Sequence, residues 1–388
     1  METSELIEII GRGEDSRHQF KEDFRNADSL AAEIIAFSNT SGGQLFIGVN
    51  DSGQVTGLSA EDVGRLNQLI SNVASQSVRP PINPLTENVV HPNGLVLVVT
   101  VSPGVSKPYQ DKDGTIWVKS GADKRRATSR EEIQRMFQSA GLIHGDELPA
   151  NGLSVGDLDL DYFSDFFQRE FEESLERQQL PLPQLLENMN LARDSILNIA
   201  GALLFAARPQ FRLPVFIVKA VSYPGDEIDA DQYLDSQDIT GKLADVFQKS
   251  LGFIVRNLSR VQSSQGINST GEPEIPRITL EELLANALIH RDYFISAPVR
   301  IFVFANRVEI ISPGHLPNNL TIENIKSGNS NIRNPILASF AAKLLPYRGL
   351  GSGILRALRA YPNIEFIDNR IGNQFKVTIH LNRAKSQS

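Results

Sequence analysis

The stretch EELLANALIHRDY (residues 281–293) decides the fold expected for the last third of the chain. It places Glu282, Asn286 and His290 at steps of four, and at 3.6 residues per turn this spacing stacks three polar side chains on one helix face. The apolar side, which a core would cover, is formed by Leu283, Leu284, Ala287 and Leu288. We therefore predict a helix whose polar stripe faces either solvent or a ligand that needs a carboxylate and an amide.

The composition is that of a globular protein of two or three domains. The chain has 388 residues, of which 41% are hydrophobic and 22% charged. It contains no cysteine, which excludes disulfides and cysteine metal sites. Its longest apolar run, residues 199–207, is much shorter than the roughly 20 residues that span a bilayer, and its first residues lack the basic start of a signal peptide. We expect a cytoplasmic protein without a membrane partner.

Charge is distributed unevenly along the chain. The formal net charge is −8, so the surface as a whole does not indicate nucleic-acid binding. Residues 119–130 nevertheless carry five basic side chains against one acidic side chain, Asp123. Taken alone, this segment is typical of a solvated turn.

Hydrophobic periodicity and turn residues predict an α+β multidomain protein. In residues 1–143, we expect a helix opened by Asp28 or Ser29, a strand–turn–strand over 44–58, and a capping box of Ser129 and Glu132 before another helix. Further strands are expected at 95–101 and 115–119. This mixture of strands and helices indicates one mixed α/β domain.

The rest of the chain is expected to hold a middle α/β region over 144–274 and a C-terminal domain over 275–388. The middle region should contain a strand at 215–221, a helix at 241–257 and a polar loop at 262–274. Strands of the C-terminal domain are expected at 299–304, 307–312 and 374–381.

Glycines gather downstream of the opening helix. Ser312 to Gly314 (SPG) follow a predicted strand, and YRGLGSGILRAL (347–358) places Gly349, Gly351 and Gly353 just ahead of an apolar helix. Glycines there let backbone N–H groups approach an anion, and a helix N-terminus favours negative charge. In this order, EELLANALIHRDY, VEIISPGHLP and GLGSGI resemble the histidine-kinase-like (GHKL) ATPase fold, and in particular the divergent ATPase domain found behind Schlafen-type domains in bacteria. The resemblance covers about residues 275–383.

The resemblance implies an α/β sandwich with an ATP site that uses Mg²⁺. Asn286 would hold the metal, and Glu282 would be the catalytic residue that orients or deprotonates water. Ser312 stands where the GHKL pattern has an aspartate that binds adenine. The cofactor-binding set implied by the resemblance is Asn286, Ser312, Gly314, Gly349, Gly351 and Gly353.

Each of these residues also has a structural interpretation. Thr279 and Glu282 form a T-x-x-E capping box, and Asn286 alone would be a solvated helix residue. The combination with the downstream glycines favours the nucleotide site.

The N-terminal segments GEDSRHQFKEDF (13–24), SLAAEIIAFSNTSGG (29–43) and QLFIGVNDSGQVTGL (44–58) resemble the Schlafen AlbA-like domain over about residues 10–140. That family implies nucleic-acid binding, with DNA favoured over RNA here. The phosphate contacts would be Arg17, Lys21, Lys119, Lys124, Arg125, Arg126 and Arg130.

Some Schlafen relatives cut RNA with three acidic residues. The matching positions here are Glu14, Gln19 and Asp51, and Gln19 cannot supply an anionic metal ligand. A metal-dependent ribonuclease is therefore the less favoured alternative to a binding site.

Together these features predict a nucleotide-regulated nucleic-acid-binding protein that forms homo-oligomers. In the family this arrangement implies an ATP-binding transcriptional regulator or a phage-defence component, with at most weak Mg²⁺-dependent ATPase activity. The second alternative is an oligomeric assembly protein whose ATPase-like domain is inactive.

Overall fold

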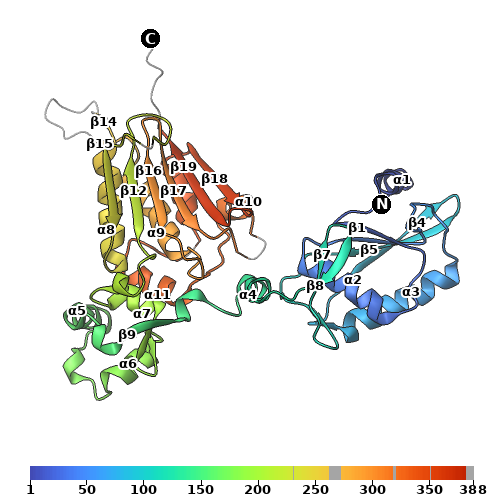
Figure 1. The fold of residues 1–388 in the computed structure, drawn as a ribbon, viewed down its shortest axis with the longest axis horizontal. Coiled ribbons are helices and arrows are strands. Elements are labelled where there is room, and N and C mark those ends of the chain that lie inside the picture. Colours follow the sequence, from blue (N-terminus) through green and yellow to red (C-terminus); the bar gives the residue numbers. More distant parts are fainter. Residues whose placement is uncertain (230, 262–271, 318–319, 350, 382–388) are drawn as a thin grey trace, which may run out of the picture. The chain divides into compact units, whose positions relative to one another are not determined.

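The computed structural model describes residues 1–229, 231–261, 272–317, 320–349 and 351–381. The chain divides into two compact units, Met1–Leu142 and Ile143–Ser388, each with its own sheets and helices (Figure 1). The predicted α+β multidomain class is confirmed. Within the described ranges, no helix combines the length and apolarity needed to cross a membrane.

A four-stranded sheet in the order β1-β2-β5-β4 forms the centre of the first unit. Its strands are β1 (His18–Lys21), β2 (Gly43–Ile47), β5 (Gly94–Val101) and β4 (Leu85–His91). β1 runs parallel to β2, and α2 (Ala27–Asn39) connects them. The second strand expected after the turn at 50–53 is reduced to one bridge between Val49 and Val55.

The expected helix over residues 27–39 forms, but its cap differs from the prediction. Asn26 accepts hydrogen bonds from the backbone N–H groups of Asp28 and Ser29, so the helix begins before both predicted caps. The apolar positions Leu30 and Phe37 are fully buried, which anchors α2 in the core.

Smaller elements complete the first unit. α1 (Thr3–Arg12) and α3 (Ala60–Asn72) were not predicted. A π-helix, η1 (Val73–Ser77), leads into β3 (Val78–Arg79), which pairs with β6 (Gln110–Asp111). The basic segment folds as a hairpin of β7 (Trp117–Ser120) and β8 (Asp123–Arg126), followed by α4 (Arg130–Ser139). Ser129 caps α4, but the Glu132 carboxylate binds Arg125 instead of closing the predicted capping box.

A six-stranded sheet in the order β13-β12-β16-β17-β19-β18 forms the centre of the second unit. Its strands are β13 (Asp235–Ile239), β12 (Val218–Ser222), β16 (Val299–Val303), β17 (Arg307–Pro313), β19 (Gln374–His380) and β18 (Ile364–Asn369). β12 pairs with β16 in parallel, and the other pairs are antiparallel. Residues 144–274, set apart in the sequence as a middle region, thus share one sheet with residues 275–388.

Helices cover this sheet. α8 (Leu243–Asn257) and α12 (Gly353–Ala360) both pack against α9 (Arg277–Ile289), while α8 also contacts β12 and α9 contacts β17. Figure 1 shows α8 and α9 beside the sheet. The remaining parts of the unit are α5 (Leu160–Phe171), α6 (Leu182–Asn188), α7 (Ile199–Phe205), α10 (Ile322–Lys326), α11 (Pro335–Leu344) and the small sheet of β9 (Pro149–Ser154), β10 (Ala192–Arg193) and β11 (Ile196–Asn198). Short β14 (Arg260–Val261) and β15 (Glu272–Pro273) pair with each other, and residues 262–271 of the expected polar loop lie outside the described residues.

Candidate functional site

Helix α9 and its C-cap carry the polar stripe of Glu282, Asn286 and His290. The helix follows Pro276 and starts at Arg277, so Thr279 lies inside its first turn and cannot be its N-cap. The Thr279 hydroxyl is buried and donates to the backbone oxygen of Ala357 on α12 at 3.4 Å. The capping-box interpretation of Thr279 and Glu282 is therefore wrong, and Glu282 is free for another role.

The carbonyl groups at the end of α9 all find partners. The last four carbonyls of a helix lack intrahelical partners, and here the acceptors are the oxygens of residues 286–289. The donors, in chain order, are His290 N at 2.9 Å, Ser312 Oγ at 2.9 Å, Tyr293 Oη at 3.0 Å and Asn334 Nδ2 at 2.7 Å. Ser312 thereby fixes β17 to the helix that bears Glu282 and Asn286.

Glu282 is a buried carboxylate with only one of its oxygens paired. The residue is 1% exposed, and its Oε1 lies 2.5 Å from Arg356 Nη2 on α12. Its Oε2 is buried and has no hydrogen-bond partner among the described residues. Burial raises the pKa of Glu282, and the charge of Arg356 opposes this rise.

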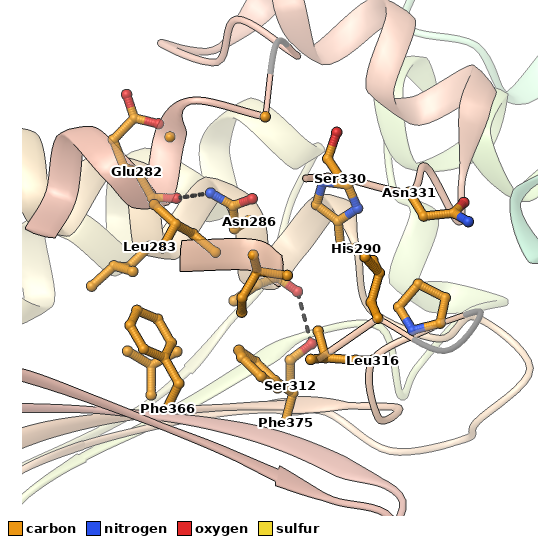
Figure 2. Close-up of a pocket in the computed structure, with 18 of the residues that line it drawn as sticks. Glu282, Leu283, Asn286, His290, Ser312, Leu316, Ser330, Asn331, Phe366 and Phe375 are labelled. Carbon is orange, nitrogen blue, oxygen red and sulfur yellow. Dashed lines mark hydrogen bonds between the residues drawn. The ribbon is translucent and has the colours of Figure 1, made fainter. Parts of the chain in front are cut away.

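Asn286 lies one turn after Glu282 on the same face. Its amide nitrogen donates to the backbone oxygen of Glu282 at 2.6 Å, as Figure 2 shows, and the amide oxygen is on the opposite side. The oxygen is thus the end available to a ligand. A neutral oxygen donor fits a hard cation such as Mg²⁺, which is commonly held by few protein ligands and substrate phosphates.

The four predicted glycines are each required by a local constraint, and the constraint differs from one glycine to the next. Gly353 opens α12, and a Cβ added there would lie 2.5 Å from Glu282 Oε2. Gly349 and Gly351 have φ of 66° and 70°, a region that L side chains avoid. Gly314 has φ of 98°, and its Cβ would lie 2.6 Å from Asp292 Cβ. Gly314 is therefore required by local packing as well.

These residues line one open pocket between α9, the start of α12 and the sheet. The pocket has about 1000 Å³ of empty space, which includes space open to solvent. Its polar wall holds Glu282, Asn286 and His290, and its apolar floor includes the stacked rings of Phe366 and Phe375, 6.1 Å apart (Figure 2). A polar end beside an apolar end suits an amphipathic ligand with a flat ring.

His290 contributes to the wall as a neutral ring. Burial lowers its pKa to about 4, and its Nε2 lies 3.1 Å from the Tyr347 hydroxyl. Because the ring is uncharged at neutral pH, the positive charge at this wall comes from arginine. Ser312 and all four predicted glycines also line the pocket.

Arg356 is one of the pocket residues that the sequence did not reveal, together with Tyr347, Phe366 and Phe375. The only available signal was its place three residues after Gly353, which puts both on one face of α12. That face packs against α9, a contact that spacing alone does not reveal.

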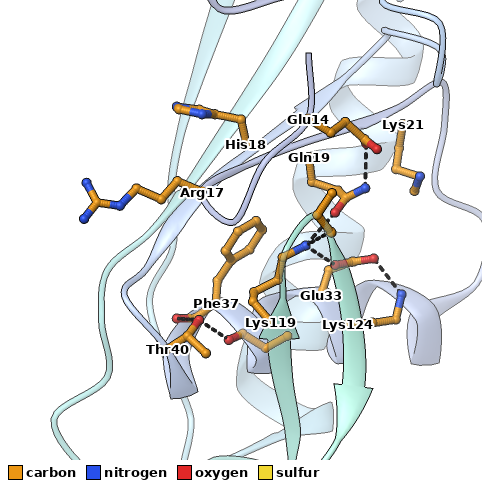
Figure 3. Close-up of polar contacts among 12 residues, drawn as sticks. Glu14, Arg17, His18, Gln19, Lys21, Glu33, Phe37, Thr40, Lys119 and Lys124 are labelled. Carbon is orange, nitrogen blue, oxygen red and sulfur yellow. Dashed lines mark hydrogen bonds and ion pairs between the residues drawn. The ribbon is translucent and has the colours of Figure 1, made fainter. Parts of the chain in front are cut away.

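In the first unit, Lys119 lies inside the domain, which differs from the surface position expected of a phosphate contact. Its ammonium group donates to Gln19 Oε1 at 2.6 Å and to the Ala122 backbone oxygen, and lies 4.9 Å from the centre of the Phe37 ring (Figure 3). The side chain is 2% exposed. Burial lowers the pKa of Lys119, and nearby Glu33 opposes that effect.

Three of the other predicted contacts have acidic partners, and one of them, Lys21, pairs with Asp51. Lys124 Nζ lies 2.6 Å from Oε1 of the buried Glu33, and Arg125 forms a two-pronged pair with Glu132. The predicted residues with exposed positions are Arg17, Arg125, Arg126 and Arg130. The basic hairpin therefore uses part of its charge for folding and leaves part on the surface.

The two acidic residues expected of the alternative nuclease, Glu14 and Asp51, also have polar partners. Glu14 Oε1 accepts from Gln19 Nε2 at 2.5 Å and from Phe20 N at 2.7 Å. Asp51 lies 3.1 Å from Lys21 Nζ. Among the residues that the structure describes, no group of three or more His, Cys, Asp or Glu side chains could hold a metal ion.

Comparisons with known proteins identify both ends of the chain. Residues 14–128 match the family model described as Schlafen, AlbA_2. Residues 296–379 match the model described as "Putative ATP-dependent DNA helicase recG C-terminal". This second match begins after Glu282 and Asn286, so it covers the four strands β16 to β19 and the glycines but not α9, β12 or β13. No curated protein matches the chain.

Solved structures also resemble the chain, among them two of bacterial proteins. A crystal structure from Corynebacterium diphtheriae is 21% identical, with 98% of this chain and 80% of that chain covered and a TM-score of 0.46. The N-terminal domain of a RecG-related protein from Nitrosomonas europaea is 21% identical, with 34% and 96% covered and a TM-score of 0.24. The family matches thus show that residues 14–128 are similar to the Schlafen AlbA_2 family and that residues 296–379 are similar to the RecG-like HATPase_c_4 family.

Proposed function

We propose that the pocket of the second unit binds ATP with Mg²⁺, and that nucleotide occupancy changes how the first unit binds nucleic acid. The observation that carries this proposal is the convergence of Glu282, Asn286 and Gly353 on one wall of an open pocket with an aromatic floor. The HATPase_c_4 match supports a nucleotide as the ligand.

Different parts of the pocket would bind the phosphates and the base of the proposed nucleotide. The phosphates would lie at the start of α12, where free backbone N–H groups and the helix dipole favour anions, within reach of the Asn286 amide oxygen. The base would lie over Phe366 and Phe375. Ser312 Oγ gives its proton to Ala287, so its lone pairs remain available to an amino group of the base.

Asn286 would hold the magnesium ion by its amide oxygen. The ion supplies charge neutralisation at the phosphates when it is bound. Glu282 would accept a proton from water during slow ATP hydrolysis, because it is the acidic side chain on the polar stripe next to Asn286.

For the first unit we propose that basic side chains bind a nucleic-acid backbone electrostatically, with DNA favoured over RNA. The exposed side chains available for phosphate contacts are Arg17, Arg125, Arg126 and Arg130. The Schlafen AlbA_2 match supports this role. Within this proposal the whole protein acts as a homo-oligomeric transcriptional regulator or phage-defence component.

Filter-binding titrations test the proposal. Labelled DNA and RNA are titrated over a salt ramp, with and without ATP and Mg²⁺, using the wild type and Asn286→Ala. We expect DNA affinity to fall steeply with salt, and ATP to change it only in the wild type. The control Asn72→Ala makes the same chemical change at an exposed position at the end of α3 and should behave as the wild type.

Coupling of this kind must be reciprocal, so DNA must change ATP affinity by the same factor. Identical DNA affinities with and without ATP in the wild type would contradict the coupling. Cleavage of RNA that is lost in Asp51→Ala would instead favour the nuclease.

A further inference from the structure

Arg356 lines the pocket beside Glu282. It lies three residues after Gly353 on α12, on the face that packs against α9. Its Nη2 lies 2.5 Å from Glu282 Oε1, while its Nε is buried and has no hydrogen-bond partner among the described residues. Arg356 thus contacts Glu282 through one end of its guanidinium group only.

The two carboxylate oxygens of Glu282 have different surroundings. Oε1 is held by Arg356, whereas Oε2 is an unpartnered acceptor beside Gly353, in the pocket wall. A buried acceptor without a partner is costly, so such groups need an explanation. A water molecule that donates to Oε2 when the pocket is filled would supply one.

We propose that Arg356 is a positioning residue for the ATPase reaction: it holds Glu282 by Oε1 so that Oε2 can take the proton of the attacking water. This inference rests on the proposed function. In the step, the water oxygen bonds to the γ-phosphorus and its proton passes to Oε2. The bond from that phosphorus to the bridging oxygen breaks, and its electron pair leaves on ADP.

The contact explains how the buried carboxyl group is oriented. Glu282 is 1% exposed, and its Oε1 is held by Arg356 Nη2 at 2.5 Å. With Oε1 held, Oε2 lies beside Gly353 in the pocket wall. The arginine therefore supplies the orientation of Glu282.

The test measures kcat and KM for ATP hydrolysis in the wild type, Arg356→Gln and Arg356→Lys. Arg359→Gln, at an exposed position on the same helix, is the matched control. We expect Arg356→Gln to lower kcat by about tenfold or more with little change in KM, because the arginine orients the group that acts in the reaction step. Arg356→Lys should keep kcat within about threefold of the wild type, because it keeps a charged donor toward Oε1.

The result also separates this inference from the proposed function. ATP binding is measured by calorimetry on the same four proteins, and Arg356→Gln should bind within about threefold of the wild type, because the group acts on the reaction step. A wild type that binds no ATP overturns the proposed function itself. A wild type that binds ATP, but either does not hydrolyse it or has the same kcat as Arg356→Gln, overturns only the role of Arg356. If Arg356→Gln does not fold, a kcat about tenfold lower in Arg356→Lys overturns it as well.

Discussion

The Ser312 hydroxyl donates a hydrogen bond to the backbone oxygen of Ala287 at 2.9 Å, and so ties β17 to the end of α9. Both groups are buried. Ser312 therefore has a structural task at the position where an adenine-binding acid was expected from the family pattern. The hydroxyl completes the helix end, because the Ala287 carbonyl has no partner within α9.

Replacing Ser312 by alanine should lower the free energy of unfolding by about 1–3 kcal/mol, because it leaves a buried carbonyl unsatisfied. Ser327→Ala removes a similar hydroxyl-to-carbonyl bond at an exposed site and should cost less than about 0.5 kcal/mol. Urea unfolding curves of both variants check this. Equal effects of the two substitutions would contradict the capping role.

Gly353→Ala should damage the pocket more than its small size implies. The new Cβ would lie 2.5 Å from Glu282 Oε2 and 3.2 Å from Asn286 Nδ2, so either the Glu282 carboxylate or α12 must shift. Such overpacking costs about 1–3 kcal/mol, and ATP affinity should fall about tenfold or more. Gly252→Ala is the control, since nothing lies within 4 Å of its Cβ in helix α8, and it should stabilise the protein by about 0.5–1 kcal/mol. Equal ATP affinities of the two variants would show that this close contact is unimportant.

Asp146 makes stability depend on pH. Its carboxylate accepts from Leu337 N at 2.9 Å in the first turn of α11, and burial raises its pKa from 3.8 to about 6. Because the folded pKa is the higher one, the folded state binds the proton more tightly. The resulting stability is fully present below pH 3.8 and is lost as the pH rises through about 6.

Asp146→Asn should remove that decline, which amounts to about 3 kcal/mol at most. Unfolding free energies measured from pH 4 to 7 should fall in the wild type and in Asp165→Asn, an exposed control on α5, and stay flatter in Asp146→Asn. Parallel curves for all three proteins would mean that another group titrates.

Two basic residues of the β7–β8 hairpin should respond differently to substitution. Lys119→Met deprives Gln19 of its buried partner and should destabilise the first unit by about 1–3 kcal/mol without changing the salt dependence of DNA binding. Arg126, exposed and 5.3 Å over the Trp117 ring, should show the reverse: Arg126→Ala lowers the salt slope by about one and barely affects stability. Thermal melts and salt-dependent filter binding measure both. A lower salt slope in Lys119→Met would place its ammonium on the nucleic acid.

Local pattern was enough to predict the elements that position the pocket. The steps of four from Glu282 to His290 predicted α9, and the glycines at 349, 351 and 353 predicted the start of α12. Both signals depend only on neighbours within a few residues, which is why sequence reveals them. The strand at 307–313 was found for the same reason.

Contacts between distant residues were not predictable in this way. Arg356 meets Glu282, and Lys119 meets Gln19, only because helices and strands far apart in the chain pack together. The parallel pairing of β12 with β16 likewise joins the middle region to the C-terminal sheet, and no local pattern records it. Charged residues such as Lys119 look exposed in sequence, since their burial depends on partners that only the fold supplies.

Calorimetric titration with ATP and Mg²⁺ tests the central claim most directly. The wild type and Asn72→Ala should bind one nucleotide per chain, and Asn286→Ala should bind at least about tenfold more weakly, because the amide oxygen that would hold the metal is gone. Omission of Mg²⁺ should weaken the wild type and leave Asn286→Ala nearly unchanged. Absence of heat from the wild type at millimolar ATP, or equal affinities for all three proteins, would contradict the claim that this pocket is a nucleotide site.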